Sequence, residues 1–162
     1  MNQSEYVDKA KKVALRFIAY RPRSESEVRS RLLKFFSVPV VDTVISELLR
    51  LSVIDDVQFA KLWCSSRESL NPKSAKAIKQ ELISMGISES NAISAVEGLD
   101  DFDTAMRIGR KYLKRLTGRS YNQFTRRLYG YLQRRGFSHS LILETSSILW
   151  TEMDNTRTEF SE

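Results

Sequence analysis

Apolar residues recur every three or four positions through most of the chain, and polar residues fill the positions between them. Three stripes of this kind are clear, from Val13 to Ile18, from Phe59 to Cys64 and from Ala105 to Tyr112. This spacing places the apolar side chains on one face of an α-helix. Alternation of the kind found in strands is weak throughout, so the pattern predicts an all-α protein.

The helical pattern repeats at a spacing of fifty residues. The matched pairs are Ile78 and Leu128, Leu82 and Leu132, Gly86 and Gly136, Ile87 and Phe137, and Ser88 and Ser138. A third copy lies upstream, where Val28 and Leu32 fall at the same offset and Phe36 stands at the glycine position. A recurring helix, glycine stop and serine restart indicate stacked helical units that bind along an extended surface, not a catalytic pocket.

Helix starts and stops divide each copy into three helices. Ser24, three residues before Glu27, predicts a capping box. Val38-Pro39 suits the start of the next helix, because proline in the first turn loses no intrahelical hydrogen bond. In the second copy we expect Ser74 to cap the helix that Gly86 ends.

The next cap, Ser88, is expected to begin a helix that buries Ile93 and Val96. The resulting hypothesis is three tandem three-helix repeats that form an elongated curved array. We assign residues 1–54 to the first repeat with an N-terminal extension, 55–100 to the second, 101–150 to the third, and 151–162 to a polar, acidic and frayed tail.

Charge is distributed unevenly among these segments. The chain of 162 residues carries a net charge of +6, but residues 101–150 hold 10 basic and 3 acidic side chains, a net +7. Residues 1–54 have a net +4, residues 55–100 a net −2 and the tail a net −3. A basic third repeat favours nucleic acid or an acidic protein surface as the partner, although basic residues also serve solubility.

Several classes of protein are disfavoured. No apolar run is long enough to span a membrane, and the first residues lack the features of a signal peptide, so we expect a cytoplasmic protein. The single cysteine, Cys64, lies in an apolar helical stripe and is expected to be a buried thiol. The single histidine, His139, follows a helix-capping serine and is expected to face solvent.

No cofactor, metal or catalytic residue is predicted. The chain has neither a P-loop nor a dinucleotide-binding glycine motif. The adjacent carboxylates of Asp55 and Asp56 suggest either a divalent metal site or a helix cap, and we favour a cap for the helix that starts near Val57. The expectation is therefore a protein that is not an enzyme.

Basic side chains are the better candidates for function. Lys73, Lys76 and Lys79 are spaced to form one side of a helix, and four arginines form a comparable cluster in the third repeat. The full set of predicted contact residues is Arg21, Arg23, Lys73, Lys76, Lys79, Arg126, Arg127, Arg134 and Arg135. Arginine forks suit phosphates and carboxylates, while a plain solvated helix face is the alternative for each cluster.

Four segments in order carry a family resemblance: Arg21–Val28, Ile54–Ala60, Ile78–Ile87 and Arg134–Phe137. Together they resemble the RecX family of bacterial RecA regulators, over roughly residues 13–150. The chain departs from that family's pattern at Phe36-Ser37, Ser52-Val53 and Ser74, where glycines are common. These departures concern local turns.

The resemblance implies a nine-helix arc of three repeats that docks in the groove of the RecA filament on DNA. It also implies a monomer that lowers RecA's ATPase and strand-exchange activities in recombination, DNA repair and the SOS response, with possible direct contact to single- or double-stranded DNA. Two alternatives stay open. One is an autonomous DNA-binding protein with a helix-turn-helix-like unit, and the other is a helical adaptor for an unrelated acidic protein.

Overall fold

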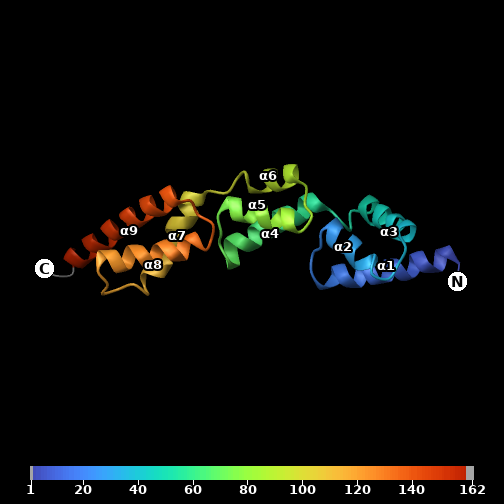
Figure 1. Ribbon diagram of the computed structural model, residues 1–162, viewed down its shortest axis with the longest axis horizontal. Helices are drawn as coiled ribbons and strands as arrows, with labels where there is room; N and C mark the ends of the chain where they lie inside the picture. The colour runs from blue at the N-terminus through green and yellow to red at the C-terminus, as the bar shows by residue number, and fades with distance from the viewer. Residues whose placement is uncertain (1, 160–162) are drawn as a thin grey trace. The chain divides into compact units, whose positions relative to one another are not determined.

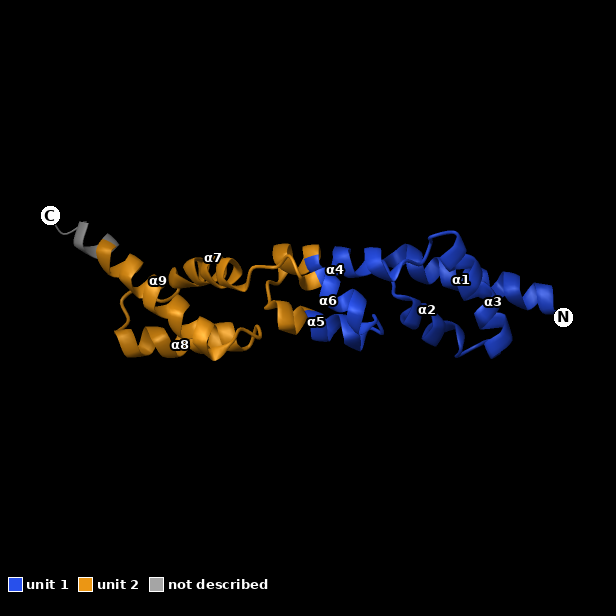
Figure 2. Ribbon diagram, turned by 90° about the horizontal axis from the view of Figure 1, so that it is seen from above, with its two compact units in different colours: residues 1–64, 79–95 blue, residues 65–78, 96–162 orange. Residues whose placement is uncertain are grey.

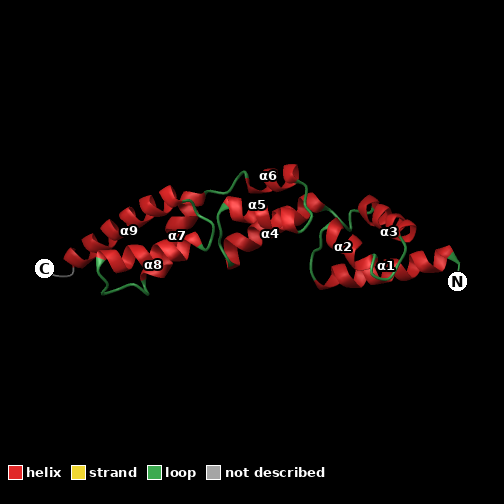
Figure 3. Ribbon diagram, viewed as in Figure 1, coloured by secondary structure: helices red, strands yellow, loops and turns green. Residues whose placement is uncertain are grey.

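The computed structural model describes residues 2–159, with side chains described for residues 2–155, and every regular element in this range is an α-helix (Figures 1 and 3). The described residues form nine helices: α1 Gln3–Tyr20, α2 Glu25–Leu32, α3 Val38–Arg50, α4 Asp56–Leu70, α5 Ala75–Ser84, α6 Glu89–Val96, α7 Asp101–Leu113, α8 Tyr121–Gln133 and α9 His139–Glu159. The prediction of an all-α fold with three helices per repeat is confirmed.

The chain divides into two compact units, which are coloured separately in Figure 2. Unit 1 comprises residues 1–64 and 79–95, and unit 2 comprises residues 65–78 and 96–162. Each unit has its own apolar core.

The core of unit 1 lies where α1, α2 and α3 meet. Ala10 and Ala14 are fully buried on α1, and their small side chains let α3 pack closely with Val41, Val44 and Leu48. Burial of an aliphatic side chain of this size stabilises the fold by about 1.5–3 kcal/mol. The apolar stripe of α3 is therefore the main contribution to this core.

The core of unit 2 lies among α7, α8 and α9, with Phe124, Leu128 and Leu132 of α8 fully buried. Gly109 permits the close approach of α7 and α9, because a Cβ atom there would lie 2.5 Å from Cδ1 of Leu149. A side chain at this position would force the Leu149 side chain to move from its place in the core. The packing of these apolar faces fixes the positions of α7 and α8 relative to each other.

The predicted helix boundaries are largely confirmed. Ser24 and Glu27 form the capping box, and proline stands in the first turn of α3. The glycine stops also hold, since Gly86 and Gly136 have φ angles of +83° and +86°. At these angles glycine is favoured because a Cβ atom is disfavoured in the left-handed region.

Two expectations are wrong. Ile93 of α6 is 47% exposed and Val96 only partly buried, because α6 presents Ala92 to the core instead. The tail is not frayed from residue 151, because α9 continues as a helix to Glu159. The same expectation for residues 160–162 falls outside the described residues.

Candidate functional site

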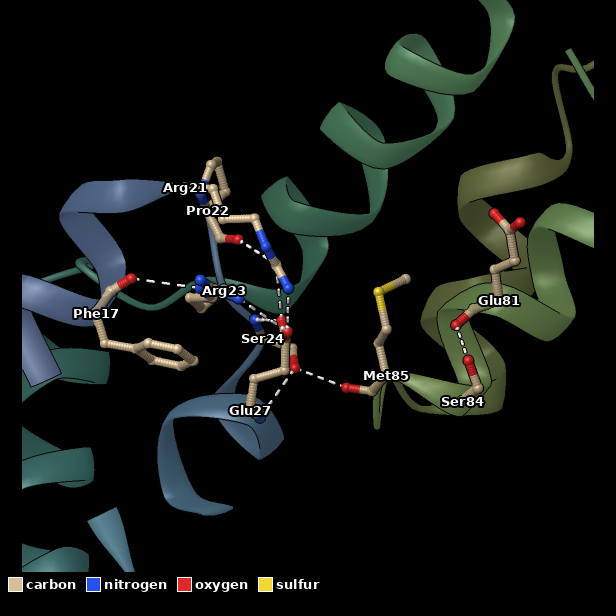
Figure 4. A network of polar contacts seen from close by, with 9 residues as sticks. All are labelled: Phe17, Arg21, Pro22, Arg23, Ser24, Glu27, Glu81, Ser84 and Met85. Carbon is tan, nitrogen blue, oxygen red and sulfur yellow. Dashed lines mark hydrogen bonds and ion pairs between the residues drawn. The ribbon is translucent and has the colours of Figure 1, made fainter. Parts of the chain in front are cut away.

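The first junction, within unit 1, joins the start of α2 to the segment that ends α5. Oγ of Ser24 accepts a hydrogen bond from the amide of Glu27 over 3.2 Å and donates one to the carbonyl oxygen of Met85 over 2.6 Å (Figure 4). Ser24 is fully buried. One hydroxyl therefore caps its own helix and bonds the next repeat.

The second junction, within unit 2, repeats this arrangement fifty residues later. Oγ of Ser74 accepts from the amide of Ala77 over 3.1 Å and donates to the carbonyl oxygen of Gly136 over 2.8 Å. The amide of Ser74 also donates to the carbonyl oxygen of Arg135 over 2.9 Å. Ser74, one of the departures from the family pattern, thus forms part of the contact between repeats.

Paired aspartates complete both junctions. Asp55 caps α4 by accepting from the amide of Gln58, whereas Asp56 accepts from the amide of Glu25, at the start of α2, over 2.8 Å. Burial raises the pKa of Asp56, opposed in part by this bond, and the nearby carboxylates raise it further. The predicted cap is confirmed for Asp55, and Asp56 has a role in the junction that sequence reasoning missed.

The second aspartate pair, Asp100 and Asp101, divides in the same way between a helix cap and a contact with another repeat. Asp100 accepts from the amide of Asp103, and Asp101 accepts from the amide of Ala75 over 2.7 Å. Both aspartate pairs are therefore occupied with backbone amides. In the described part of the chain, no group of three or more side chains is arranged to hold a metal ion.

The glycine stops permit the close approach at each junction. A Cβ atom on Gly86 would lie 2.2 Å from Cβ of Ser26, and one on Gly136 would lie 2.7 Å from Cβ of Ala77. Either contact is too short for two carbon atoms. The glycines therefore serve both the left-handed turn and the packing of one repeat on the next.

Arg21 and Arg23, two predicted contact residues, lie beside the first junction and bind Glu27 (Figure 4). Arg21 bonds the Glu27 carboxylate over 2.6 Å, and the guanidinium of Arg23 lies 3.9 Å from the centroid of the Phe17 ring. Burial raises the pKa of Glu27, but hydrogen bonds from Arg21 and the Ser24 amide, with the charges of Arg21 and Arg23, bring it below its ordinary value. The Arg23 side chain is only 12% exposed, so most of its surface is used within unit 1.

The three lysines predicted to lie along one side of a helix have different surroundings. Lys76 is exposed on α5, and Lys73 precedes that helix and is half-buried. Lys79 pairs with Glu89 over 3.2 Å. Lys76 is therefore the member of this set whose surroundings best fit contact with a partner.

The arginines of the third repeat surround a hollow in unit 2 of about 550 Å³. We call this the arginine hollow, and its lining residues are Tyr112, Arg119, Gln123, Arg126, Arg127, Gly130 and Arg134. Arg126, Arg127 and Arg134 project from α8 or its end and are exposed. No described carboxylate pairs with any of them or with Arg119, so their charges are available to an external anion.

A stack of side chains lies beside the arginine hollow. The rings of Tyr112 and Tyr131 are stacked with centroids 4.0 Å apart, and the guanidinium of Arg135 lies 3.8 Å from the centroid of Tyr131. Arg135 also donates to the carbonyl oxygen of Tyr131. Arg135 therefore holds the stacked rings of Tyr112 and Tyr131 in place. The other three predicted arginines, Arg126, Arg127 and Arg134, line the hollow.

Sequence reasoning missed four residues that line this hollow: Tyr112, Arg119, Gln123 and Gly130. Arg119 lies in the loop before α8, and Tyr112 comes from α7, so neither belongs to the helical spacing that singled out the other arginines. Gly130 also contributes, because a Cβ there would lie 3.2 Å from a terminal nitrogen of Arg134. A glycine inside a predicted helix next to three arginines is the signal that was available.

Comparison with known proteins places these features in a family. Sequence models of the first, second and third RecX three-helix domains match residues 10–48, 55–95 and 100–145, respectively. The chain belongs to the RecX family. Regulatory protein RecX of Mycobacterium avium is 33% identical over 85% of this chain and 82% of its own length.

Further relatives agree with this assignment. Regulatory protein RecX of Mycolicibacterium smegmatis is 32% identical, over 87% of this chain and 79% of the relative. A crystal structure of RecX from Lactobacillus salivarius shares the fold with a TM-score of 0.78 at 23% identity, covering 90% of this chain and 97% of that chain. Among the described residues, no helix has both the length and the apolar character to cross a membrane.

Proposed function

We propose that this RecX chain regulates RecA by binding in the groove of the RecA filament on DNA, where it lowers ATP hydrolysis and strand exchange. Family membership supports a regulatory role. The arginine hollow of unit 2 supports this mode of binding. Four arginines line it without a described carboxylate partner, and three of them, Arg126, Arg127 and Arg134, are exposed, while Arg119 is half-buried.

The chemistry of the arginine hollow favours phosphate. Guanidinium groups bind phosphate oxygens through two parallel hydrogen bonds, and four of them around one hollow accommodate more than one phosphate. The side chain of Gln123 adds an amide donor, and the Tyr112 ring forms an apolar wall. These features support contact with the DNA backbone within the filament, without reading of its sequence.

In this proposal the chain regulates RecA in two ways: it competes with the second DNA for the groove, and it restrains the movements of RecA subunits. A protein in the filament groove occupies the path of the second DNA, which strand exchange requires. Contacts of several linked repeats with neighbouring RecA subunits also oppose the movements that accompany ATP turnover. Linkage gives the repeats a high effective concentration for one another's sites, so binding favours the polymer over the free RecA subunit.

Electron microscopy of RecA filaments on single-stranded DNA tests the mode of binding. We expect added density that follows the groove when this RecX chain is present, and loss of that density for the variant carrying Arg126→Glu, Arg127→Glu and Arg134→Glu. Filaments that sediment without the wild-type chain at near-equal molar ratio would contradict the proposal.

The same arginine hollow also favours a second candidate function, direct DNA binding without RecA. Under that alternative the chain binds duplex or single-stranded DNA alone at physiological salt, and the triple variant loses this binding uniformly across sequences. Anisotropy of a labelled oligonucleotide with and without RecA separates the two. Equal affinity in both conditions would favour autonomous DNA binding.

A further inference from the structure

A second hollow lies in unit 1, between α1 and the end of α2, and has a volume of about 490 Å³. We call it the α1 hollow, and its lining residues are Lys9, Lys12, Val13, Arg16, Arg31, Phe35 and Phe36. No predicted contact residue lines it. The proposed binding of DNA phosphates by unit 2 leaves this surface without a role.

One wall of the α1 hollow is a single helix face. Lys9, Lys12 and Arg16 are three and four residues apart on α1, so their side chains project from the same side, with Val13 among them. Val13 packs against the core of unit 1 and is partly buried. The wall is therefore apolar at its base and positively charged along its rim.

The opposite wall is aromatic. Phe36 is partly buried against the core of unit 1, whereas Phe35 is 62% exposed. The guanidinium of Arg31 lies 5.3 Å from the centroid of the Phe35 ring and 5.9 Å from that of Phe17. Arg31 thus adds a fourth positive charge and helps to hold the exposed ring in position.

The α1 hollow differs chemically from the arginine hollow. Its base consists of Val13, Phe35 and Phe36, and none of the described residues that line it is a carboxylate. An apolar base requires an apolar side chain from the ligand, and the rim requires negative charge. The phosphates of a nucleic acid would supply the charge, but its flat bases stack on exposed rings, and Arg31 already lies near Phe35, the exposed ring of this hollow. The partly buried Val13 and Phe36 are better suited to a flexible apolar side chain.

We propose that the α1 hollow binds an acidic polypeptide segment of a partner protein, with an apolar or aromatic side chain of that segment inserted against Val13 and Phe36. The charges of Lys12, Arg16 and Arg31 attract the segment, and burial of the inserted side chain holds it. This inference goes beyond the proposed regulation of RecA and does not rest on it.

The test uses the full chain and three labelled probes in fluorescence anisotropy. The first is a short glutamate-rich peptide with two phenylalanines, the second is the same peptide with glycines in place of the phenylalanines, and the third is an oligothymidine. We expect the first peptide to bind the wild-type chain at least about tenfold more tightly than the second, since the apolar anchor supplies much of the affinity.

Two variants locate the binding. The double variant Lys12→Glu, Arg16→Glu and the single variant Phe35→Ala each raise the Kd of the first peptide by about tenfold or more. The double variant reverses two charges of the rim, and Phe35→Ala removes the exposed ring of the aromatic wall beside Phe36. All three positions are exposed, so the fold is retained, as circular dichroism would verify. The charge-matched control Lys61→Glu, Lys111→Glu replaces exposed lysines outside both hollows and keeps wild-type affinity.

Three results would overturn the proposal. The first is no binding of the phenylalanine-containing peptide to the wild-type chain, and the second is equal affinity for both peptides, which would indicate charge attraction alone. The third is oligothymidine binding that the double variant and Phe35→Ala abolish, which would make the α1 hollow a nucleic-acid site. None of these readouts involves RecA, so failure here is distinguishable from failure of the proposed regulation.

Discussion

The hydroxyl of Ser74 donates a hydrogen bond over 2.8 Å to the carbonyl oxygen of Gly136, sixty-two residues further along the chain. Ser24, fifty residues before Ser74, donates a similar bond over 2.6 Å to the carbonyl oxygen of Met85, the residue before Gly86. The repeat in the sequence therefore encodes a repeated contact as well as repeated helices. Each serine begins one helix and fixes the end of a helix from the following repeat.

The positions that break the repeat fit this account. Phe36 stands at the glycine position of the first repeat and packs against the core of unit 1. Phe124 stands fifty residues after Ser74 and is fully buried in the core of unit 2. Serine or glycine thus occupies these repeat positions where two repeats meet. At the equivalent positions that lie outside a junction, phenylalanine packs into the core instead.

Ser74→Ala is expected to lower the free energy of unfolding by about 2 kcal/mol, because it removes a helix cap and a buried hydrogen bond together. Ser120→Ala is the matched control. Ser120 also caps a helix but is exposed, so its loss costs about 0.5–1 kcal/mol. Urea unfolding measures both, and equal losses would contradict the role of Ser74 in the junction.

Gly136→Ala and Gly118→Ala separate packing from backbone strain. Both glycines have positive φ angles, +86° and +79°, so alanine is strained at each by about 1 kcal/mol. Only at Gly136 does a Cβ also meet Ser74 and Ala77, each at 2.7 Å, whereas nothing lies within 4 Å at Gly118. We expect Gly136→Ala to cost about 3 kcal/mol in thermal or urea unfolding, and similar costs for both would show that the second junction is not closely packed.

Glu27→Gln is expected to lower the free energy of unfolding relative to the wild type at neutral pH and to change it little in acid. The pKa of Glu27 is lower in the folded chain than its ordinary value of 4.5, so its charge stabilises the fold above that pH. This stabilisation is lost as the pH falls from 4.5 through the lower folded-state pKa. Urea unfolding from pH 7 to pH 3 should show the two proteins converging, and a constant or growing difference would contradict the pairing with Arg21.

Sequence reasoning succeeded where the signal is local. The capping box of Ser24, the stops at Gly86 and Gly136 and the cap by Asp55 each depend on a few neighbouring residues, and each is confirmed. The buried thiol of Cys64 followed from helical spacing in the same way. Helix caps and helical periodicity can be predicted from the sequence because the residues that interact lie within about one helical turn of each other.

Long-range partners were not predicted, because sequence spacing carries no information about them. Asp56 and Asp101 bond amides of α2 and α5, and Arg119 joins the arginine hollow from a loop. Ile93 was expected to be buried from its spacing, but the alternative face of α6 packs on the core. Sequence identified the arginines of α8, while only the structure separates Arg135, stacked on Tyr131, from those that face the hollow.

Ser52→Gly is expected to raise the free energy of unfolding by about 0.5–1 kcal/mol. Ser52 has a φ angle of +54°, which is disfavoured for a residue with a Cβ, and the RecX family resemblance predicts glycine there. Relief of this strain exceeds the added entropy of the unfolded chain. Thermal unfolding measures the change, and a lower midpoint for Ser52→Gly would mean that the serine side chain stabilises this turn.

The rate of ATP hydrolysis by RecA on single-stranded DNA tests the central claim most directly. We expect the wild-type chain to lower that rate at near-equal molar ratio, and the variant with Arg126→Glu, Arg127→Glu and Arg134→Glu to need at least about tenfold more protein for the same effect. The control with Lys61→Glu, Lys111→Glu and Arg115→Glu changes the charge equally outside the arginine hollow and should inhibit as the wild type does. Undiminished inhibition by the arginine variant, or no inhibition by the wild-type chain, would contradict the account.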